Sequence, residues 1–289
     1  MRLSYSWVDV FAAEPFAGNP LCVFRAPDDL PDRVMQRLTR ELGHSETTFL
    51  QGAGQRLRIF VPSGDGAVEI PFAGHPILGS ACVAVPAGGA VTFAIGVGPV
   101  AVTVDPVGPG VWQARMQQPV PRVRWTRAGT GLLASALGLE VAALRQDLPV
   151  EAVANGMASV LVPVSSLGDV ERARPDLPRL AQLFGRDGSC VVVFATGGLA
   201  PDADVHCRVF SPFDLAPEDP ATGSANGPLG DYLVRHGVLP GPLVRAEQGY
   251  VLGRPSRLLT EVVRRDGQTV AIYVSGRVIL VGQGEFVFP

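Results

Sequence analysis

Short runs of β-branched and aromatic residues, separated by glycine and proline, dominate this chain of 289 residues. Such runs are typical of β-strands, and the glycine and proline between them are typical of turns. The predicted strands are residues 5–11, 21–24, 47–50, 57–61, 91–95, 100–104, 111–116, 160–164, 190–195, 205–210, 258–263, 269–274 and 278–281.

Segments with a helical period are few. Residues 31–42 place Val34, Leu38 and Leu42 on one face, and Gly43 follows as a helix-ending glycine. Further helices are predicted at 74–85, at 223–236 before Gly237, and, with a weaker pattern, at 130–139 and 177–184. The pattern therefore predicts an α+β protein, a mostly antiparallel sheet with a few embedded helices.

The two halves of the chain repeat each other. Residues 58–62 (Arg-Ile-Phe-Val-Pro) return as 208–212 (Arg-Val-Phe-Ser-Pro), and 71–75 (Pro-Phe-Ala-Gly-His) return as 220–224 (Pro-Ala-Thr-Gly-Ser). The offsets are 150 and 149 residues, about half the chain length. Upstream, we align 46–49 with 191–194. The repeat predicts two similar domains, 1–120 and 121–281, with residues 282–289 returning to the first and a connector near 118–130. A site is expected in the cleft between such halves.

Composition narrows the classes of function. Hydrophobic residues make up 47% and charged residues 18%, which suits a folded core. The net charge is −3 without a basic stripe, so no nucleic-acid partner is expected. No apolar stretch reaches the roughly 18–20 residues of a membrane helix, and the N-terminus lacks a signal-peptide core. These features predict a cytoplasmic protein with no membrane association.

The residue types present also argue against most cofactors. All 24 basic residues are Arg, so the chain has no Lys for a pyridoxal-phosphate Schiff base or a phosphate-binding loop. The cysteines Cys22, Cys82, Cys190 and Cys207 form no C-x-x-C motif, and the histidines show no H-E-x-x-H spacing. We therefore expect no cofactor and no metal.

Each repeat places a glycine and a polar residue at a predicted helix start. In the first copy Pro76 suits the first helical position, and in the second Ser224 can cap the helix. Helix N-termini offer free N–H groups, so the starts at Gly74 and Gly223 are candidate anion sites. Facing each other across a cleft, they could clamp a carboxylate. Plain capping of two structural helices is the alternative.

Two carboxylates break the symmetry of the repeat. Asp219 aligns with Ile70, and Glu46 aligns with Val191, an apolar position. For Glu46, an acid where the sister domain is apolar indicates a semi-buried group with a raised pKa, suited to acid–base chemistry. For Asp219, the asymmetry favours a chemical role. The alternatives are an Asp-Pro turn for Asp219 and an exposed strand-end residue for Glu46.

Several motifs, in order along the chain, together resemble the phenazine-biosynthesis isomerase (PhzF-like) family. They are Phe16-Ala-Gly-Asn19-Pro20, Ser45-Glu-Thr-Thr-Phe49, Pro71-Phe-Ala-Gly-His-Pro76, Glu218-Asp-Pro-Ala-Thr-Gly-Ser-Ala225, Gln248-Gly249 and Arg254-Pro-Ser256. Each motif alone is weak, but the combination is specific and covers essentially the whole chain.

The resemblance implies a fold similar to diaminopimelate epimerase, with two pseudo-symmetric β-barrel-like domains, each around a central helix. It implies a cofactor-independent isomerase of trans-2,3-dihydro-3-hydroxyanthranilate, acting as a homodimer. By the family pattern Glu46 is the proton shuttle, with the polar partners His75, Asp219 and Ser224. The substrate-binding positions are Asn19, Ser45, Gly74 and Gly223.

The resemblance also extends to related epimerases and racemases, which look like enzymes that use two thiols, one from a Cys just before the glycine of each helix start. This chain has Ala73 and Thr222 at these two positions. A one-base proton shift by Glu46 is therefore favoured over two-base inversion. Two alternatives stay open: the same scaffold acting on another small-molecule acid, and a non-catalytic binding protein of this fold.

Overall fold

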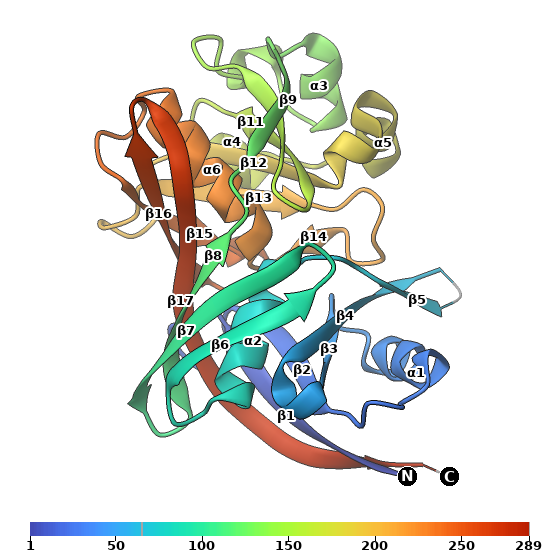
Figure 1. Cartoon of the computed structure of the whole chain (residues 1–289). Coiled ribbons are helices and arrows are strands. Elements are labelled where there is room, and N and C mark those ends of the chain that lie inside the picture. Colours follow the sequence, from blue (N-terminus) through green and yellow to red (C-terminus); the bar gives the residue numbers. More distant parts are fainter. Residues whose placement is uncertain (65, 289) are drawn as a thin grey trace. The chain divides into compact units, whose positions relative to one another are not determined.

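The computed structural model describes residues 1–64 and 66–288 and divides the chain into two compact units (Figure 1). Unit 1 is Met1–Gln117 with Ser275–Pro289, and unit 2 is Gln118–Val274. The sequence alone suggested breaks at 120/121 and 281/282. No helix in the described part of the chain is long and apolar enough to cross a membrane.

Unit 1 is built around a closed eight-stranded barrel. Its ring follows the order β1–β2–β3–β4–β6–β7–β8–β17 and returns to β1, with β5 added beside β4. The strands are β1 (Arg2–Val10), β2 (Asn19–Arg25), β3 (Thr47–Gln51), β4 (Arg56–Ser63), β5 (Gly66–Glu69), β6 (Gly89–Ile95), β7 (Gly98–Gly108), β8 (Val111–Gln118) and β17 (Gln268–Val287). The eight strands of the ring itself therefore have no unpaired edge, and β5 is added outside it.

Two helices serve unit 1 in different ways. Helix α1 (Asp32–Leu42) is amphipathic, packs against β4 and β5 from outside, and ends at Gly43 in the left-handed conformation, as the sequence predicts. Helix α2 (Gly74–Ala84) is buried from Gly74 to Val83 and contacts β1, β2, β3, β4 and β7 (Figure 1). Its burial makes it the core of the barrel.

Small residues let α2 fit inside. A Cβ atom on Gly79 would lie 2.7 Å from a Leu21 methyl and 3.0 Å from methyls of Val8 and Val10. Real side chains do not approach so closely, so this position of the helix has space only for glycine.

Unit 2 repeats the ladder of unit 1. Its strands are β9 (Arg122–Arg127), β10 (Val150–Ala154), β11 (Ala158–Pro163), β12 (Cys190–Thr196), β13 (Val205–Phe210), β14 (Glu218–Asp219), β15 (Leu243–Gln248) and β16 (Ser256–Arg265). Its helices are α3 (Gly131–Ala136), α4 (Leu167–Arg172), α5 (Leu177–Phe184) and the buried α6 (Gly223–Arg235). Three strand pairs of unit 1 have a counterpart of the same direction in unit 2. The parallel pairs β2–β3 and β4–β6 match β11–β12 and β13–β15. The antiparallel pair β3–β4 matches β12–β13.

The same arginine clamp appears in both units. Arg58 on β4 forms a bidentate ion pair with Glu69, and Arg208 on β13 forms one with Glu218 at 2.8 and 2.7 Å. Arg58 also binds Asp32 of α1 at 2.6 Å, and Arg208 also donates to carbonyls at the end of α4. Each arginine therefore ties an outer helix to an equivalent strand.

Several sequence expectations need correction. The predicted connector near 118–130 contains β9, the segments 269–274 and 278–281 are one strand, and the predicted helix 130–139 is shorter. Strands β5, β9, β10, β14 and β15 and helix α4 were not predicted. Most of these are short, and the charged residues of β9 and β15 hide the apolar signal.

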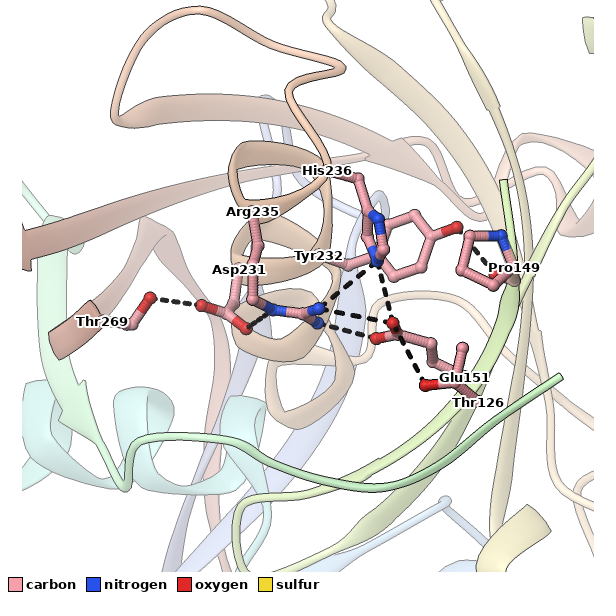
Figure 2. Close-up of polar contacts among 8 residues, drawn as sticks. All are labelled: Thr126, Pro149, Glu151, Asp231, Tyr232, Arg235, His236 and Thr269. Atoms are coloured by element: carbon pink, nitrogen blue, oxygen red, sulfur yellow. Dashed lines mark hydrogen bonds and ion pairs between the residues drawn. The ribbon is translucent and has the colours of Figure 1, made fainter. Parts of the chain in front are cut away.

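The C-terminal end of α6 is held by a buried charge network (Figure 2). Glu151 on β10 accepts hydrogen bonds from Arg235 at 2.7 Å and pairs with His236 at 2.8 Å, and Arg235 also binds Asp231 at 3.1 Å. Burial works to raise the pKa of Glu151, but the bonds from Arg235 and His236 outweigh it, so the pKa lies below its usual value.

We expect Glu151→Gln to lower the free energy of unfolding at pH 7 by about 3 kcal/mol, because it leaves a partly buried arginine less well paired. A carboxylate with a lowered folded-state pKa stabilises the fold above its unfolded pKa, near 4.5, and loses this effect at lower pH. Denaturant unfolding from pH 7 to 3 should show the two proteins converging. Glu285→Gln, which removes an exposed pair with Arg2, is the control and should cost at most about 1 kcal/mol. A constant gap at all pH values would contradict the network's role.

Gly79→Val should destabilise the protein by about 2 kcal/mol through overpacking inside the barrel. The matched control is Gly66→Val, since a Cβ there has open space and valine suits a strand. Thermal unfolding of the two variants measures the difference, and equal melting temperatures would refute the packing argument.

Candidate active site

Four of the predicted site residues lie together in unit 1. The Glu46 carboxylate is 3.5 Å from His75 Nε2, Asn19 Nδ2 lies 3.0 Å from His75 Nδ1, and the Ser45 hydroxyl donates to Asn19 Oδ1 at 3.3 Å. Asn19 and His75 are buried, and the Glu46 side chain is 15% exposed. The structure thus places the Glu46 carboxylate beside a hydrogen-bonded chain that runs from Ser45 through Asn19 to His75.

Local backbone features bring these side chains together. Glu46 immediately precedes β3, whose first residue, Thr47, pairs with both Cys22 and Phe60. Asn19 opens β2 after Gly18, which has φ = +66° and whose Cβ would lie 2.3 Å from the Val10 carbonyl. Only glycine fits this turn, and it directs Asn19 towards the start of α2.

His75 is neutral and its tautomer is defined. Burial lowers the pKa of His75 to about 3, and the nearby His44 adds to the shift. Because Ser45 donates to Asn19 Oδ1, the Asn19 amide presents its NH2 to Nδ1, which must accept. The ring proton is therefore on Nε2, the nitrogen that faces Glu46.

The predicted residues of unit 2 gather at the start of α6. The Thr222 hydroxyl donates to Asp219 Oδ2 at 2.5 Å. Gln248, at the end of β15, donates to the Asp219 carbonyl at 2.7 Å and to Thr222 Oγ1 at 3.0 Å, while its Oε1 accepts from the Thr222 N–H at 3.0 Å. Gln248 thus fixes the direction of the hydroxyl that binds Asp219.

Both helix caps differ from the sequence prediction. Pro76 is the third residue of α2, not the first, and Ser224 is the second residue of α6, not its cap. Proline is tolerated there because the N–H groups of the first turn have no partner within the helix. The cap residues are Ala73, which has no side-chain acceptor, and Thr222, whose hydroxyl binds Asp219 instead.

The equivalence assigned to Glu46 also needs correction. Thr47 pairs with Phe60 and Val191 pairs with Phe210, so Thr47 corresponds to Val191 and Glu46 to Cys190. The one-residue error arose because phenylalanine ends both compared segments. Ile70 does correspond to Asp219. The Ile70 N–H donates to the Ile59 carbonyl, Asp219 pairs with Val209, and Ile59 and Val209 are equivalent positions of the repeat. Each acid therefore corresponds to a residue without a carboxylate in the other half of the chain.

Sequence reasoning missed two buried amides in unit 2. Gln118 Nε2 donates to the Gly223 carbonyl at 2.8 Å, and Asn155 Nδ2 donates to the Ser224 carbonyl at 2.9 Å. Gln118 lies in the segment assigned as a connector, and Asn155 follows the unpredicted strand β10. Pro228 inside the predicted helix was the available signal, because it leaves one carbonyl without a helical donor.

The described residues contain no group of three or more His, Cys, Asp or Glu side chains placed to hold a metal ion. What unit 1 offers is a carboxylate beside a neutral imidazole, and what unit 2 offers is a carboxylate beside a helix N-terminus. Such groups can exchange protons and bind an anion.

Comparison with known proteins identifies the family of the chain. The family model described as "Phenazine biosynthesis-like protein" matches residues 8–284. The chain belongs to this phenazine biosynthesis-like family. A family relative, trans-2,3-dihydro-3-hydroxyanthranilate isomerase from Pseudomonas fluorescens, is 35% identical and is matched over 98% of this chain and 99% of its own length. Like such relatives, this family member is an isomerase.

Solved structures define the fold of this phenazine biosynthesis-like protein. A PhzF-family protein from Bacillus anthracis matches with a TM-score of 0.87 at 24% identity, over 100% of both chains. A probable proline racemase from Agrobacterium radiobacter matches with a TM-score of 0.66 at 12% identity, over 99% of this chain and 93% of its own. The fold is therefore the α+β architecture shared with racemases and epimerases, as the sequence predicts.

The pKa of His75 predicts how the stability of the protein depends on pH. Below pH 6.5 the unfolded chain protonates this histidine, whereas the folded chain does not until about pH 3. The free energy of unfolding therefore decreases as the pH is lowered from 6.5 towards 3. Between pH 7.5 and 5 the loss should be about 2 kcal/mol. His75→Gln should lack it, so denaturant unfolding of the two proteins should differ in slope against pH. Parallel curves would show that His75 is not held neutral.

Proposed function

We propose that this protein is a cofactor-independent isomerase that shifts a proton between carbons of a small cyclic carboxylic acid such as trans-2,3-dihydro-3-hydroxyanthranilate. The observation that carries the proposal is the chain of contacts from Ser45 through Asn19 and His75 to Glu46. The substrate class is suggested by relatives that are 35% identical over nearly the whole chain.

Glu46 is the acid–base group of the proposal. As a carboxylate it removes a proton from the carbon next to the hydroxyl, and the electron pair of that C–H bond moves into the ring system. The resulting carboxylic acid returns the proton to another carbon, so substrate and product have the same composition. The reaction is redox-neutral and therefore requires no flavin or nicotinamide.

His75 supports Glu46 as a neutral donor. Its Nε2–H faces the carboxylate, and Asn19 keeps the proton on this nitrogen. A neutral imidazole stabilises the carboxylate without fixing it as an ion pair, so Glu46 can take up and release a proton. Ser45 and Asn19 are proposed to bind substrate as well as to orient the ring.

The residues of unit 2 are proposed as substrate-binding and proton-holding groups. Asp219 is held by Thr222 and Gln248, so its carboxylate is oriented before substrate arrives. Ser224 and the N–H group at Gly223 begin α6, and Gly74 begins α2, where N–H groups favour a bound carboxylate.

Three of the four cysteines support a one-base mechanism. Burial raises the pKa of Cys22 and of Cys207 to about 12 and raises that of Cys82 as well. A thiol must ionise to act as a base, and these three stay protonated at neutral pH. The positions before the helix-start glycines are Ala73 and Thr222, so neither carries a thiol.

Glu46→Gln should lower turnover by roughly two to four orders of magnitude, because it keeps the shape of the side chain but removes the base. Binding of 3-hydroxyanthranilate, the aromatic analogue that has no proton to shift, should change little. Turnover is followed by NMR in D2O, which also records deuterium entering the product, and binding is followed by calorimetry.

The matched control is Glu41→Gln, which changes an exposed glutamate of α1 and should leave turnover unchanged. A Glu46→Gln protein with near-normal turnover would refute the proton-shuttle role. Binding of 3-hydroxyanthranilate by the natural protein without any conversion of the dihydro acid would instead indicate another substrate or a binding protein.

A further inference from the structure

A proline interrupts the hydrogen bonding of α6 close to its start. In a regular helix the N–H of residue 228 would donate to the carbonyl of Ser224, four residues earlier. Pro228 has no N–H, and its ring crowds that same carbonyl. Ser224 is 5% exposed, so its carbonyl needs a donor from the protein.

Asn155 supplies this donor. Its Nδ2 lies 2.9 Å from the Ser224 carbonyl and also donates to Gln118 Oε1 at 3.1 Å. Gln118 Nε2 in turn donates to the Gly223 carbonyl at 2.8 Å. Both amide side chains are 2% exposed, so water does not compete strongly for these groups.

Gly227 completes the arrangement. A Cβ atom at this position would lie 2.1 Å from Gln118 Oε1, so any other residue would push the amide away. Helical hydrogen bonds hold a turn only to its own helix, whereas Asn155 follows β10 and Gln118 ends β8. The two amides therefore fix the first turn of α6 to the sheet.

We propose that Asn155 and Gln118 are positioning residues that fix the Ser224 and Gly223 carbonyls, and with them the first turn of α6, for substrate binding. The bond from Asn155 to Ser224 takes the place of the helical bond that Pro228 cannot make. This inference rests on the proposed function, because Gly223 and Ser224 are substrate-binding groups only in that proposal. Asn155 has two separable roles: it gives the buried Ser224 carbonyl a hydrogen-bond donor, and it holds that carbonyl at a fixed position relative to β10.

The test combines Asn155→Leu with Pro228→Ala, which restores the missing N–H. Asn155→Leu alone should lower the melting temperature by about 5 °C, because it leaves a buried carbonyl unpaired. In the double variant the helix bonds Ser224 itself, so the melting temperature should recover in part, while Gln118 Oε1 still lacks the Asn155 donor. The turn is still released from β10, so 3-hydroxyanthranilate should bind about tenfold more weakly than to Pro228→Ala alone, measured by calorimetry.

The matched control is Asn226→Leu, which removes a buried amide that lies in the first turn of α6 itself. Asn226 donates to the Thr222 carbonyl, which also accepts from two backbone N–H groups and does not depend on residue 228. Pro228→Ala should not recover the stability lost in this variant. If it recovers both variants equally, the pairing of Asn155 with Pro228 is wrong.

The other outcomes are also decisive. Recovery of affinity together with stability in the double variant would show that Asn155 only satisfies a carbonyl, and the positioning role would be rejected. Failure of both Asn155 variants to fold would show that Pro228 is not the reason Asn155 is needed. If the natural protein neither binds nor converts the acids, the proposed function falls and the positioning role with it, whereas the melting temperatures still report the hydrogen-bond replacement.

Discussion

The structure depends on placing a helix inside a closed ring of strands. The eight-stranded ring of unit 1 leaves room for α2 only because the helix is rich in glycine, alanine, serine and cysteine, and Gly79 touches β1 and β2 directly. In unit 2 the buried helix α6 also packs closely, through Gly227 and Gly230 against Gln118 and Thr260. Close packing of this kind fixes the helix axis, and with it the point where each helix begins.

The repeat also shows which interactions the fold uses twice and which it uses once. The bidentate pairs of Arg58 with Glu69 and of Arg208 with Glu218 occupy equivalent positions and tie outer helices to the sheet in both units. Glu46 and Asp219 have no such counterpart, since Cys190 and Ile70 stand in their places. The repeated charges thus serve the architecture. Other charges, such as Glu151 with Arg235, also hold the fold, and the candidates for chemistry are Glu46 and Asp219.

Sequence patterns predicted the elements whose signal is local and strong, among them α1, α2, α6 and the long apolar strands. They also found the repeat, because its proline and glycine positions survive in both copies. They failed where a role depends on partners distant in sequence. Asn155 and Gln118 could not be recognised as donors to Ser224 and Gly223 without the fold, and the alignment of Glu46 needed the strand register.

The packing constraint and the proposed chemistry have a common cause. Because the barrel buries α2 from its first residue, His75 in its first turn is also buried, and burial is the main reason that its pKa falls to about 3. Asn19, at the start of a barrel strand, then has a fixed neutral ring to donate to, and the remaining ring proton points at Glu46. An exposed helix start would leave a histidine that titrates near neutral pH and changes its tautomer freely. The small side chains that allow α2 inside the barrel therefore also define the protonation state beside the proposed base.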